Sequence, residues 1–237
     1  MTETKPKFTI ITATLNCEIY IQKCLESIYK QTYSNWDHLI IDGGSSDKTI
    51  EIVRSYSRSR LIKQKTSGLW AAMQEALEFA QGYIQFLNSD DYLFDKYVLE
   101  SVADSINASE MPKNMIFYGK SLRVNFANTP IYMHTPPSKL SLFKFNIYFP
   151  LISHQEAFIH SNIYSKVSLI NERYSWCHDI AFFRSLFILG YKFQPLRRTV
   201  ACFRLHNSNA SDKQFRSYAK YLFSDWNNLP ISFFPLI

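Results

Sequence analysis

Hydrophobic positions in the first half of the chain alternate between β-type runs and helical spacing. Between the first two β-rich runs, Ile21, Cys24, Leu25 and Ile28 recur with the period of a helix. The predicted strands are 8–14, 38–41, 60–65 and 83–87, and the predicted helices are 21–28, 47–56 and 69–80. Such repeated units predict an α/β fold whose mostly parallel, Rossmann-like central sheet is flanked by helices, with right-handed crossovers.

The second half, from about residue 111, alternates less regularly. Three further strands are predicted at 115–118, 122–125 and 131–133, followed by a Pro-Pro turn at 135–138 and a helix over 179–189. No linker separates the two halves, so we expect one domain over 1–212, divided at about residue 110. A C-terminal helical tail is expected over 213–237.

Polar, turn-forming segments follow three of the predicted strands. These segments are 14–16, 42–47 and 88–91. Because ligands of open α/β sheets bind beyond the carboxyl ends of the strands, we expect the three segments to form one site.

Composition and charge exclude several classes of protein. The 237 residues are 46% apolar and 19% charged, which is typical of a globular domain and not of a disordered chain. The net charge of +6 is dispersed along the sequence, which disfavours nucleic acid as a partner. No apolar run approaches 18 residues and no cleavage pattern follows the first strand, so we expect a cytoplasmic protein.

Two of the rim segments carry candidate chemistry. Asp42 precedes two glycines, and its carboxylate is suited to accept hydrogen bonds from a nucleobase or ribose, whereas Ser46 or Asp47 fits an ordinary helix N-cap. Asp90 and Asp91 are adjacent carboxylates that repel each other unless a cation is near, and oxygen ligands suit Mg²⁺ or Mn²⁺. The alternative is that one of them caps a helix beginning at residue 92.

Taken together, these segments resemble the family 2 glycosyltransferases, which have the GT-A nucleotide-sugar-binding fold. The matching segments, in order, are 12–16 (TATLN), 42–49 (DGGSSDKT), 68–73 (GLWAAM), 88–93 (NSDDYL), 154–155 (HQ), 179–184 (DIAFFR) and 203–206 (FRLH). Their order and spacing match the family over about residues 7–212, so the first half would bind the donor and the second the acceptor.

The resemblance implies a role for each matched residue. The donor nucleotide would be bound by Thr12, Thr14, Asn16, Asp42, Gly68, Asn88 and Asp90; a Mn²⁺ or Mg²⁺ ion by Asp90 and His206; and the acceptor by His154 and Gln155. Asp179 occupies the position of the general base that takes the proton of the acceptor hydroxyl in an inverting transfer. An aspartate at a helix start is also favoured as an N-cap, so the local sequence alone fits both roles.

The implied activity is transfer of a sugar from a nucleoside diphosphate, most commonly UDP, to a glycan or lipid-linked acceptor in bacterial surface polysaccharide or lipopolysaccharide assembly. The sequence departs from the family at Leu15 (commonly aromatic), Thr66 (acidic), Ala71 (Asp) and His178 (Glu), and 74–76 (QEA) replaces Asn-Lys-Gly. These departures fit either an altered choice of sugar or reduced activity, and the second gives an alternative, a catalytically weakened protein that binds a sugar nucleotide. A Rossmann dehydrogenase is disfavoured because no G-x-G-x-x-G follows the first strand.

The C-terminal tail suggests contact with an anionic membrane surface. Lys213, Arg216 and Lys220 precede an apolar, aromatic end, and basic residues of this kind favour anionic lipid. Packing of this end on the domain is an equally good interpretation.

Overall fold

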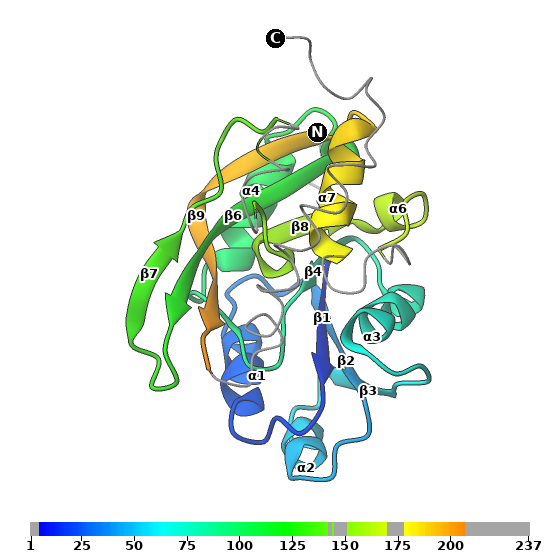
Figure 1. Cartoon of the computed structure of the whole chain (residues 1–237), viewed down its shortest axis with the longest axis vertical. Coiled ribbons are helices and arrows are strands. Elements are labelled where there is room, and N and C mark those ends of the chain that lie inside the picture. The colour runs from blue at the N-terminus through cyan, green and yellow to red at the C-terminus, as the bar shows by residue number, and fades with distance from the viewer. Residues whose placement is uncertain (1–4, 142–143, 145–150, 170–177, 207–237) are drawn as a thin grey trace, which may run out of the picture.

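The structure is a computed structural model that describes residues 5–141, 144, 151–169 and 178–206 (Figure 1). Its strands are β1 Phe8–Thr14, β2 Trp36–Asp42, β3 Ser59–Lys63, β4 Tyr83–Phe86, β5 Tyr92–Leu93, β6 Met115–Val124, β7 Pro130–His134, β8 Ala157–His160 and β9 Lys192–Arg204. Its α-helices are α1 Ile21–Tyr29, α2 Thr49–Arg54, α3 Leu69–Ala76, α4 Val98–Asn107, α6 Ser161–Tyr164 and α7 His178–Ile188. Short 3-10 helices are η1 Leu77–Phe79, η2 Pro112–Asn114 and η3 His154–Glu156.

The strands form one sheet in the order β3-β2-β1-β4-β8-β6-β9-β5, and β7 pairs with β6. The first four strands are parallel, which confirms the repeated strand, helix and strand units predicted for the first half. Beyond β4 the sheet is mixed, because β8 is antiparallel to both β4 and β6 while β9 is parallel to β6. Figure 1 shows the long β6 and β9 curving away from the parallel strands.

Hydrophobic cores cover both faces of the sheet, as the alternation along β1 requires. Ile11 and Ala13 face a core that includes side chains of α3 and α7. Phe8 and Ile10 face the opposite core, which includes side chains of α1 and α4. Successive side chains of a strand point to opposite faces of the sheet. Burying all seven residues of β1 therefore requires helices on both sides.

The strand predictions in the second half need a correction at β6. The sequence predicts separate strands at 115–118 and 122–125, but the structure has one continuous strand through Gly119. A Cβ at Gly119 would lie 2.6 Å from Val200 Cγ1 and 2.8 Å from Arg198 O, so the glycine allows close approach of β9 and does not end the strand. The pairing shifts register on either side of Lys120, and this irregularity absorbs the close approach.

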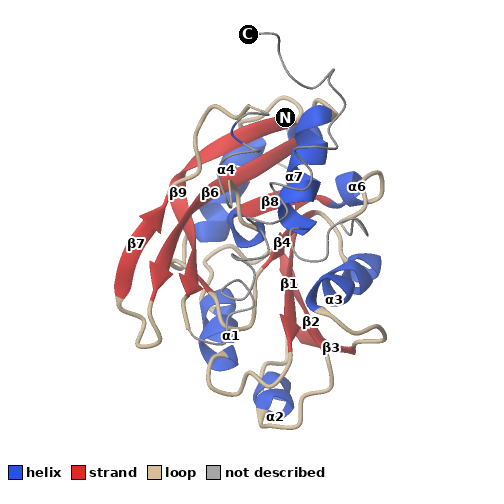
Figure 2. Cartoon of the chain, in the orientation of Figure 1, coloured by secondary structure: helices blue, strands red, loops and turns tan. Residues whose placement is uncertain are grey.

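Other elements begin or end at different residues from those predicted. The helix predicted over 47–56 is the shorter α2, and the stripe over 69–80 divides into α3 and η1. The predicted strand 60–65 is β3, which ends at Lys63. A helix beginning at residue 92 is wrong, because Tyr92 and Leu93 form β5 against β9. The strands β8 and β9 and the helix α4, visible in Figure 2, were not predicted.

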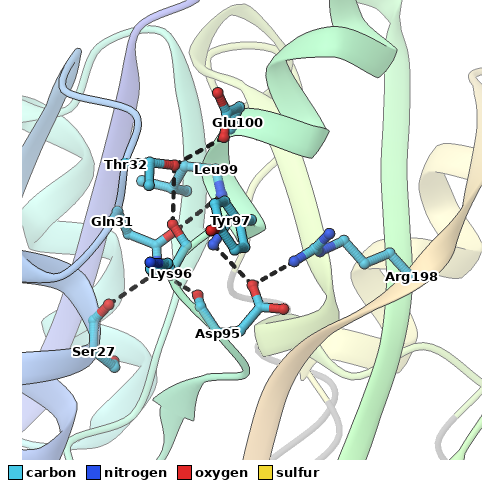
Figure 3. A network of polar contacts seen from close by, with 9 residues as sticks. All are labelled: Ser27, Gln31, Thr32, Asp95, Lys96, Tyr97, Leu99, Glu100 and Arg198. Atoms are coloured by element: carbon cyan, nitrogen blue, oxygen red, sulfur yellow. Dashed lines mark hydrogen bonds and ion pairs between the residues drawn. The ribbon is translucent and has the colours of Figure 1, made fainter.

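Polar contacts fasten α1 to the start of α4 (Figure 3). The Gln31 side chain donates to Ser27 O and Asp95 O, and it accepts from Leu99 N, so the amide satisfies backbone groups of both helices and their connection. Asp95 also pairs with Arg198 of β9. This network connects the donor half to the curved second half of the sheet.

Several features of the sequence lie outside the described residues. They are the C-terminal tail and residues 142–143 and 145–150 of the segment 138–152, which is rich in aromatic residues. In the part of the chain that the structure describes, no helix is both long enough and apolar enough to cross a lipid bilayer.

Gly82, which precedes β4, provides a first stability test. Its φ is +71°, and a Cβ there would lie 2.2 Å from Lys7 O. We expect Gly82→Ala to lower the free energy of unfolding by about 3 kcal/mol or more, because left-handed strain adds to a backbone clash. Gly190 has a φ of +81° with open space around it, so Gly190→Ala should cost only about 1 kcal/mol. Urea denaturation measures the free energy of unfolding of both variants. Equal losses of stability in the two would contradict a backbone clash at Gly82.

His38 on β2 is wholly buried, and its two ring nitrogens lie 2.9 Å from Ser59 Oγ and 3.0 Å from Thr12 Oγ1. Burial lowers the pKa of His38 to about 3. The unfolded chain protonates this residue near its ordinary pKa of about 6.5, so the unfolded state binds more protons below that pH.

We therefore expect the free energy of unfolding to fall as the pH drops from about 6.5 towards 3, by up to about 1.4 kcal/mol per unit from this residue. Urea denaturation at several pH values measures the slope. In His38→Gln the slope should be smaller, and parallel curves for the two proteins would contradict this origin.

Candidate active site

The three polar segments predicted to share one rim do come together. Asn16 after β1 donates from its backbone N to Ser45 Oγ (2.9 Å) and accepts from Ser46 N (2.8 Å) after β2. Ser89 after β4 donates to Cys17 Sγ at 3.0 Å. Asn16 itself has a φ of +51°, a conformation that asparagine tolerates better than most residues. The carboxyl ends of β1, β2 and β4 therefore meet as expected.

Asp42 lies at the end of β2, and its carboxylate faces the loop that follows. One oxygen accepts from Gly44 N (2.8 Å) and Ser45 N (3.0 Å), and the other accepts from Ser45 Oγ (2.5 Å). A carboxylate offers about four acceptor positions, so these three bonds leave one. The φ of Gly44 is +99°, which explains why glycine stands there.

Thr12 and Thr14 are both buried within β1. The Thr12 hydroxyl contacts His38 and lies 3.9 Å from Cys24 Sγ, so this side chain is directed into the protein. Thr14 Oγ1 is buried and has no hydrogen-bond partner among the described residues. Of these two predicted donor residues, only Thr14 has a side-chain oxygen with unused bonding capacity at the end of the strand.

Asp90 and His206 meet across the sheet. Their Oδ2 and Nε2 atoms lie 2.8 Å apart, and the imidazole stacks on Tyr20 with ring centroids 5.0 Å apart. These are the two metal ligands that the resemblance implies, brought together from positions 116 residues apart. Among the residues that the structure describes, no three His, Cys, Asp or Glu side chains form a group that could hold a metal ion.

Asp91 is buried directly behind Asp90. Burial, together with the negative charge of Asp90, raises the pKa of Asp91 well above its usual range. Arg204 N donates to Asp91 Oδ1 (2.9 Å) and Arg204 Nε donates to Asp90 O (2.9 Å). The buried Arg204 guanidinium also lies over the rings of Tyr20 and Tyr92. This arginine therefore fixes the backbone at Asp90 through its side chain and binds the Asp91 carboxylate through its own backbone N.

A chain of polar contacts connects the donor loop to α7. Asn88 Nδ2 donates to Asp91 Oδ2 at 3.1 Å, and Asn88 Oδ1 lies 3.2 Å from His154 Nε2. On the other side of the ring, His154 Nδ1 lies 3.7 Å from Asp179 Oδ2. Asp179 Oδ1 accepts from Ile180 N at 2.9 Å. The predicted base and the predicted donor loop thus lie on opposite sides of one imidazole.

Trp70 of α3 packs beside this chain. Its ring contacts His154 and His178, with centroids 5.5 Å and 5.4 Å apart. Burial lowers the pKa of His178, so the residue that replaces the usual glutamate contributes a neutral ring. Gln155, predicted to bind the acceptor, is wholly buried, and its amide atoms have no hydrogen-bond partner among the described residues.

The loop before α3 is held by a residue that departs from the family. Glu75 accepts from Lys65 N (2.8 Å) and Thr66 N (2.7 Å), and these bonds lower the pKa of Glu75. Gln64 donates to Gly68 O at 2.8 Å. Gly68, at a φ of +108°, then begins α3. The loop is therefore fixed although Thr66 supplies no carboxylate.

Sequence reasoning missed three residues of this site: Tyr20, Trp70 and Arg204. Trp70 and Arg204 lie inside matched segments but had no role assigned. No sequence signal indicates Tyr20, because its contacts are with residues more than 100 positions away.

The comparisons with known proteins agree with this architecture. Residues 9–178 match the model of glycosyl transferase family 2, which is more than half of the chain. The chain therefore belongs to glycosyl transferase family 2, and the predicted resemblance is confirmed.

Curated relatives in several bacteria are glycosyltransferases by name. The PGL/p-HBAD biosynthesis glycosyltransferase of Mycobacterium tuberculosis is 30% identical over 176 residues, which cover 71% of this chain and 65% of the relative. TuaG of Bacillus subtilis, named for teichuronic acid biosynthesis, is 27% identical over 94% of this chain and 88% of its own length. GlyA of Streptococcus pneumoniae is 38% identical over 97 residues, and the match spans only 14% of its length.

Solved structures confirm the GT-A fold. TarS of Staphylococcus aureus, crystallised with UDP, superposes with a TM-score of 0.68 at 21% identity, over 84% of this chain and 60% of that one. The mannosyltransferase PcManGT of Pyrobaculum calidifontis, in complex with GDP-Man and Mn²⁺, gives a TM-score of 0.66 at 16% identity, over 96% of this chain and 66% of the other.

Proposed function

We propose that the chain is a metal-dependent, inverting glycosyltransferase that moves a sugar from a nucleoside diphosphate donor to a glycan or lipid-linked acceptor during assembly of a bacterial surface polysaccharide. The observation that carries this proposal is an arrangement around the polar contacts of Asn88 and His154. Asp90, paired with His206, lies on one side of these contacts, and Asp179 lies on the other side. An inverting transfer needs these two functions close together, one for the departing diphosphate and one for the incoming hydroxyl.

On the donor side, Asn16, Thr14 and Gly68 line the rim where the nucleotide would lie, and Asp42 would contact the base with its remaining acceptor position. A UDP-linked donor is supported by TarS, whose structures contain UDP and UDP-GlcNAc. PcManGT contains GDP-Man instead, so relatives of this fold accept more than one base.

On the metal side, one carboxylate and one imidazole fit Mn²⁺ better than Mg²⁺, which prefers oxygen ligands only. Asp90 and His206 would hold the ion, which when bound neutralises charge on the departing diphosphate. Two protein ligands are enough where substrate phosphates complete the coordination. Asp90 Oδ2 and His206 Nε2 lie 2.8 Å apart, so both candidate ligand atoms are already close together, and binding of the ion would replace the hydrogen bond between them.

On the acceptor side, Asp179 would take the proton of the attacking hydroxyl as that oxygen bonds to the sugar. The segment 138–152, whose aromatic residues include Phe143, Phe145 and Tyr148, would contact the acceptor. The tail over 213–237 would bring the protein to an anionic membrane surface where a lipid-linked acceptor lies.

The metal assignment predicts that Mn²⁺ raises the melting temperature of the wild-type protein only when a nucleoside diphosphate sugar is present. Asp90→Ala should abolish this effect and the transfer reaction, because Asn88 and Ser89 supply no charged oxygen. Asp37→Ala is the control, since Asp37 is an exposed aspartate at the opposite end of β2. Metal-dependent donor binding that persists in Asp90→Ala would place the metal elsewhere.

The base assignment predicts that Asp179→Asn retains donor affinity while turnover falls by roughly 10² to 10⁴. Calorimetry and transfer assays on the same preparation separate the two quantities. If the substitution unfolds the protein, Asp179 is a structural cap. A wild-type protein that binds donor but transfers no sugar to any acceptor would favour the weakened, nucleotide-binding alternative.

A further inference from the structure

His154 has one hydrogen-bonding atom on each side of the active site, and the hydrogen bonds around it determine where its protons lie. Asn88 donates through Nδ2 to Asp91 Oδ2, so its Oδ1 is the atom that faces His154 Nε2. An amide oxygen only accepts, so with this orientation of the Asn88 amide His154 Nε2 carries the hydrogen. In the neutral ring the other nitrogen, Nδ1, then carries a lone pair.

That lone pair is directed at the proposed base. Nδ1 lies 3.7 Å from Asp179 Oδ2, is buried, and has no hydrogen-bond partner among the described residues. Two acceptors that face each other are expected to stay beyond hydrogen-bond length. A proton placed between them would convert the contact into a hydrogen bond.

The surroundings keep the ring in this position. His154 begins η3, whose backbone is fixed because Ser153 N donates to Glu156 Oε2 (2.8 Å) in a capping box. Glu156 is itself wholly buried, and its other oxygen contacts Ser121 Oγ and His134 Nδ1. Glu156 thus faces away from Asp179. Trp70 packs edge-on against the His154 ring.

The gap between His154 and Asp179 is small and largely apolar. Both residues line one small cavity together with aromatic side chains that include Phe86 and Phe182. Water is therefore a poor competitor for a proton held there, and electrostatic interactions are stronger than in solvent.

We infer that His154 is the positioning residue of the general base: it shares, through Nδ1, the proton that Asp179 takes from the acceptor hydroxyl. This inference rests on the proposed function. As the hydroxyl oxygen bonds to the sugar, its O–H bond breaks and the proton passes to the Asp179 carboxylate. The lone pair of His154 Nδ1 then binds that proton, while Nε2–H stays bonded to Asn88. The proton leaves to solvent after the product does.

The charged and titratable groups around the ring fit this role. Asp179 faces it from α7, Asp91 stands behind Asn88 on the donor loop, and His178 lies across Trp70. Asp91 holds the orientation of Asn88, which connects the state of the donor loop to the base. Binding of the donor diphosphate beside Asn88 would thus act on the same imidazole.

The test uses His154→Gln in the full chain, because the glutamine amide can still donate to Asn88 but offers nothing to Asp179. We expect kcat to fall about tenfold, as for other groups that support a reacting group from behind, with donor affinity unchanged. The acid limb of the kcat profile should move to lower pH, since a carboxylate alone holds its proton less tightly than the shared site. His154→Phe, which also loses the bond to Asn88, should weaken donor binding as well.

A double variant separates this role from a structural one. In the Asp179→Asn background, His154→Gln should cause no further loss of turnover, because both act on one proton. Fully additive losses, or an acid limb that does not move, would overturn the inference.

A spectroscopic arm is independent of transfer activity. Nitrogen-15 NMR of the histidine rings, with His154→Gln to assign the signal, should show the Nε2–H tautomer of His154. If the spectrum shows the Nδ1–H tautomer, the inference is wrong, whether or not transfer can be measured. If the spectrum shows the Nε2–H tautomer but no transfer is found, only the proposed function is contradicted.

Discussion

A buried carboxylate at the end of β4 is the constraint on which both sides of the site depend. Asp91 is 1% exposed, and a charge so placed is costly unless hydrogen bonds and a nearby cation compensate it. The hydrogen bonds come from the backbone N of Arg204, at the end of β9, and from Asn88, three residues earlier in the chain, and the positive charge of Arg123 favours the ionised form of Asp91. The hydrogen bonds to the Asp91 carboxylate therefore join the two halves of the sheet at the proposed active site.

Two consequences follow from that joining. Because Arg204 must reach Asp91, His206 emerges two residues later beside Asp90, and the pair of proposed metal ligands assembles. Because Asn88 donates its Nδ2 hydrogen to Asp91, its oxygen faces His154, and this orientation is the basis of the tautomer inferred for that ring. The geometry of the base at α7 is thus connected to the donor loop by hydrogen bonds that the buried charge imposes.

The parallel half of the fold was predictable from the sequence, and the mixed half was not. In the first half each strand and helix has a local hydrophobic period, which is the signal that sequence reasoning reads. β9 has no such period, because Pro195 and the arginines 197 and 198 interrupt it and its thirteen residues alternate irregularly between buried and exposed. Its place in the sheet is set by pairing with β6, a contact between segments far apart in sequence. Gly119 was misleading for the same reason, since its role depends on Val200.

The candidate site divides in a similar way. The three rim segments were predictable because the carboxyl ends of parallel strands share an edge, and the matched motifs identified Asn88, Asp90, Asp179 and His206. The directions of individual side chains were not predictable. The Thr12 hydroxyl faces the buried His38, and Gln155 is enclosed in the protein, because the alternation of β1 and the turn of η3 decide which way each side chain points. Neither direction follows from the motif itself.

The departures from the family lie in three places, at Leu15 after β1, in α3 with the loop before it, and at His178 beside the proposed base. Thr66 and Ala71 lack carboxylates that relatives commonly have, but Glu75 binds the backbone of that loop directly at Lys65 and Thr66. The loop is therefore held by its own hydrogen bonds to Glu75, in place of a carboxylate at residue 66. For this reason the loop is where we place an altered selection of the sugar. Asp90 and Asp179, by contrast, are retained together with the buried groups that orient them. A buried aspartate, an arginine and an imidazole surround the two carboxylates, and this arrangement supports the proposed transferase over the alternative that only binds a sugar nucleotide.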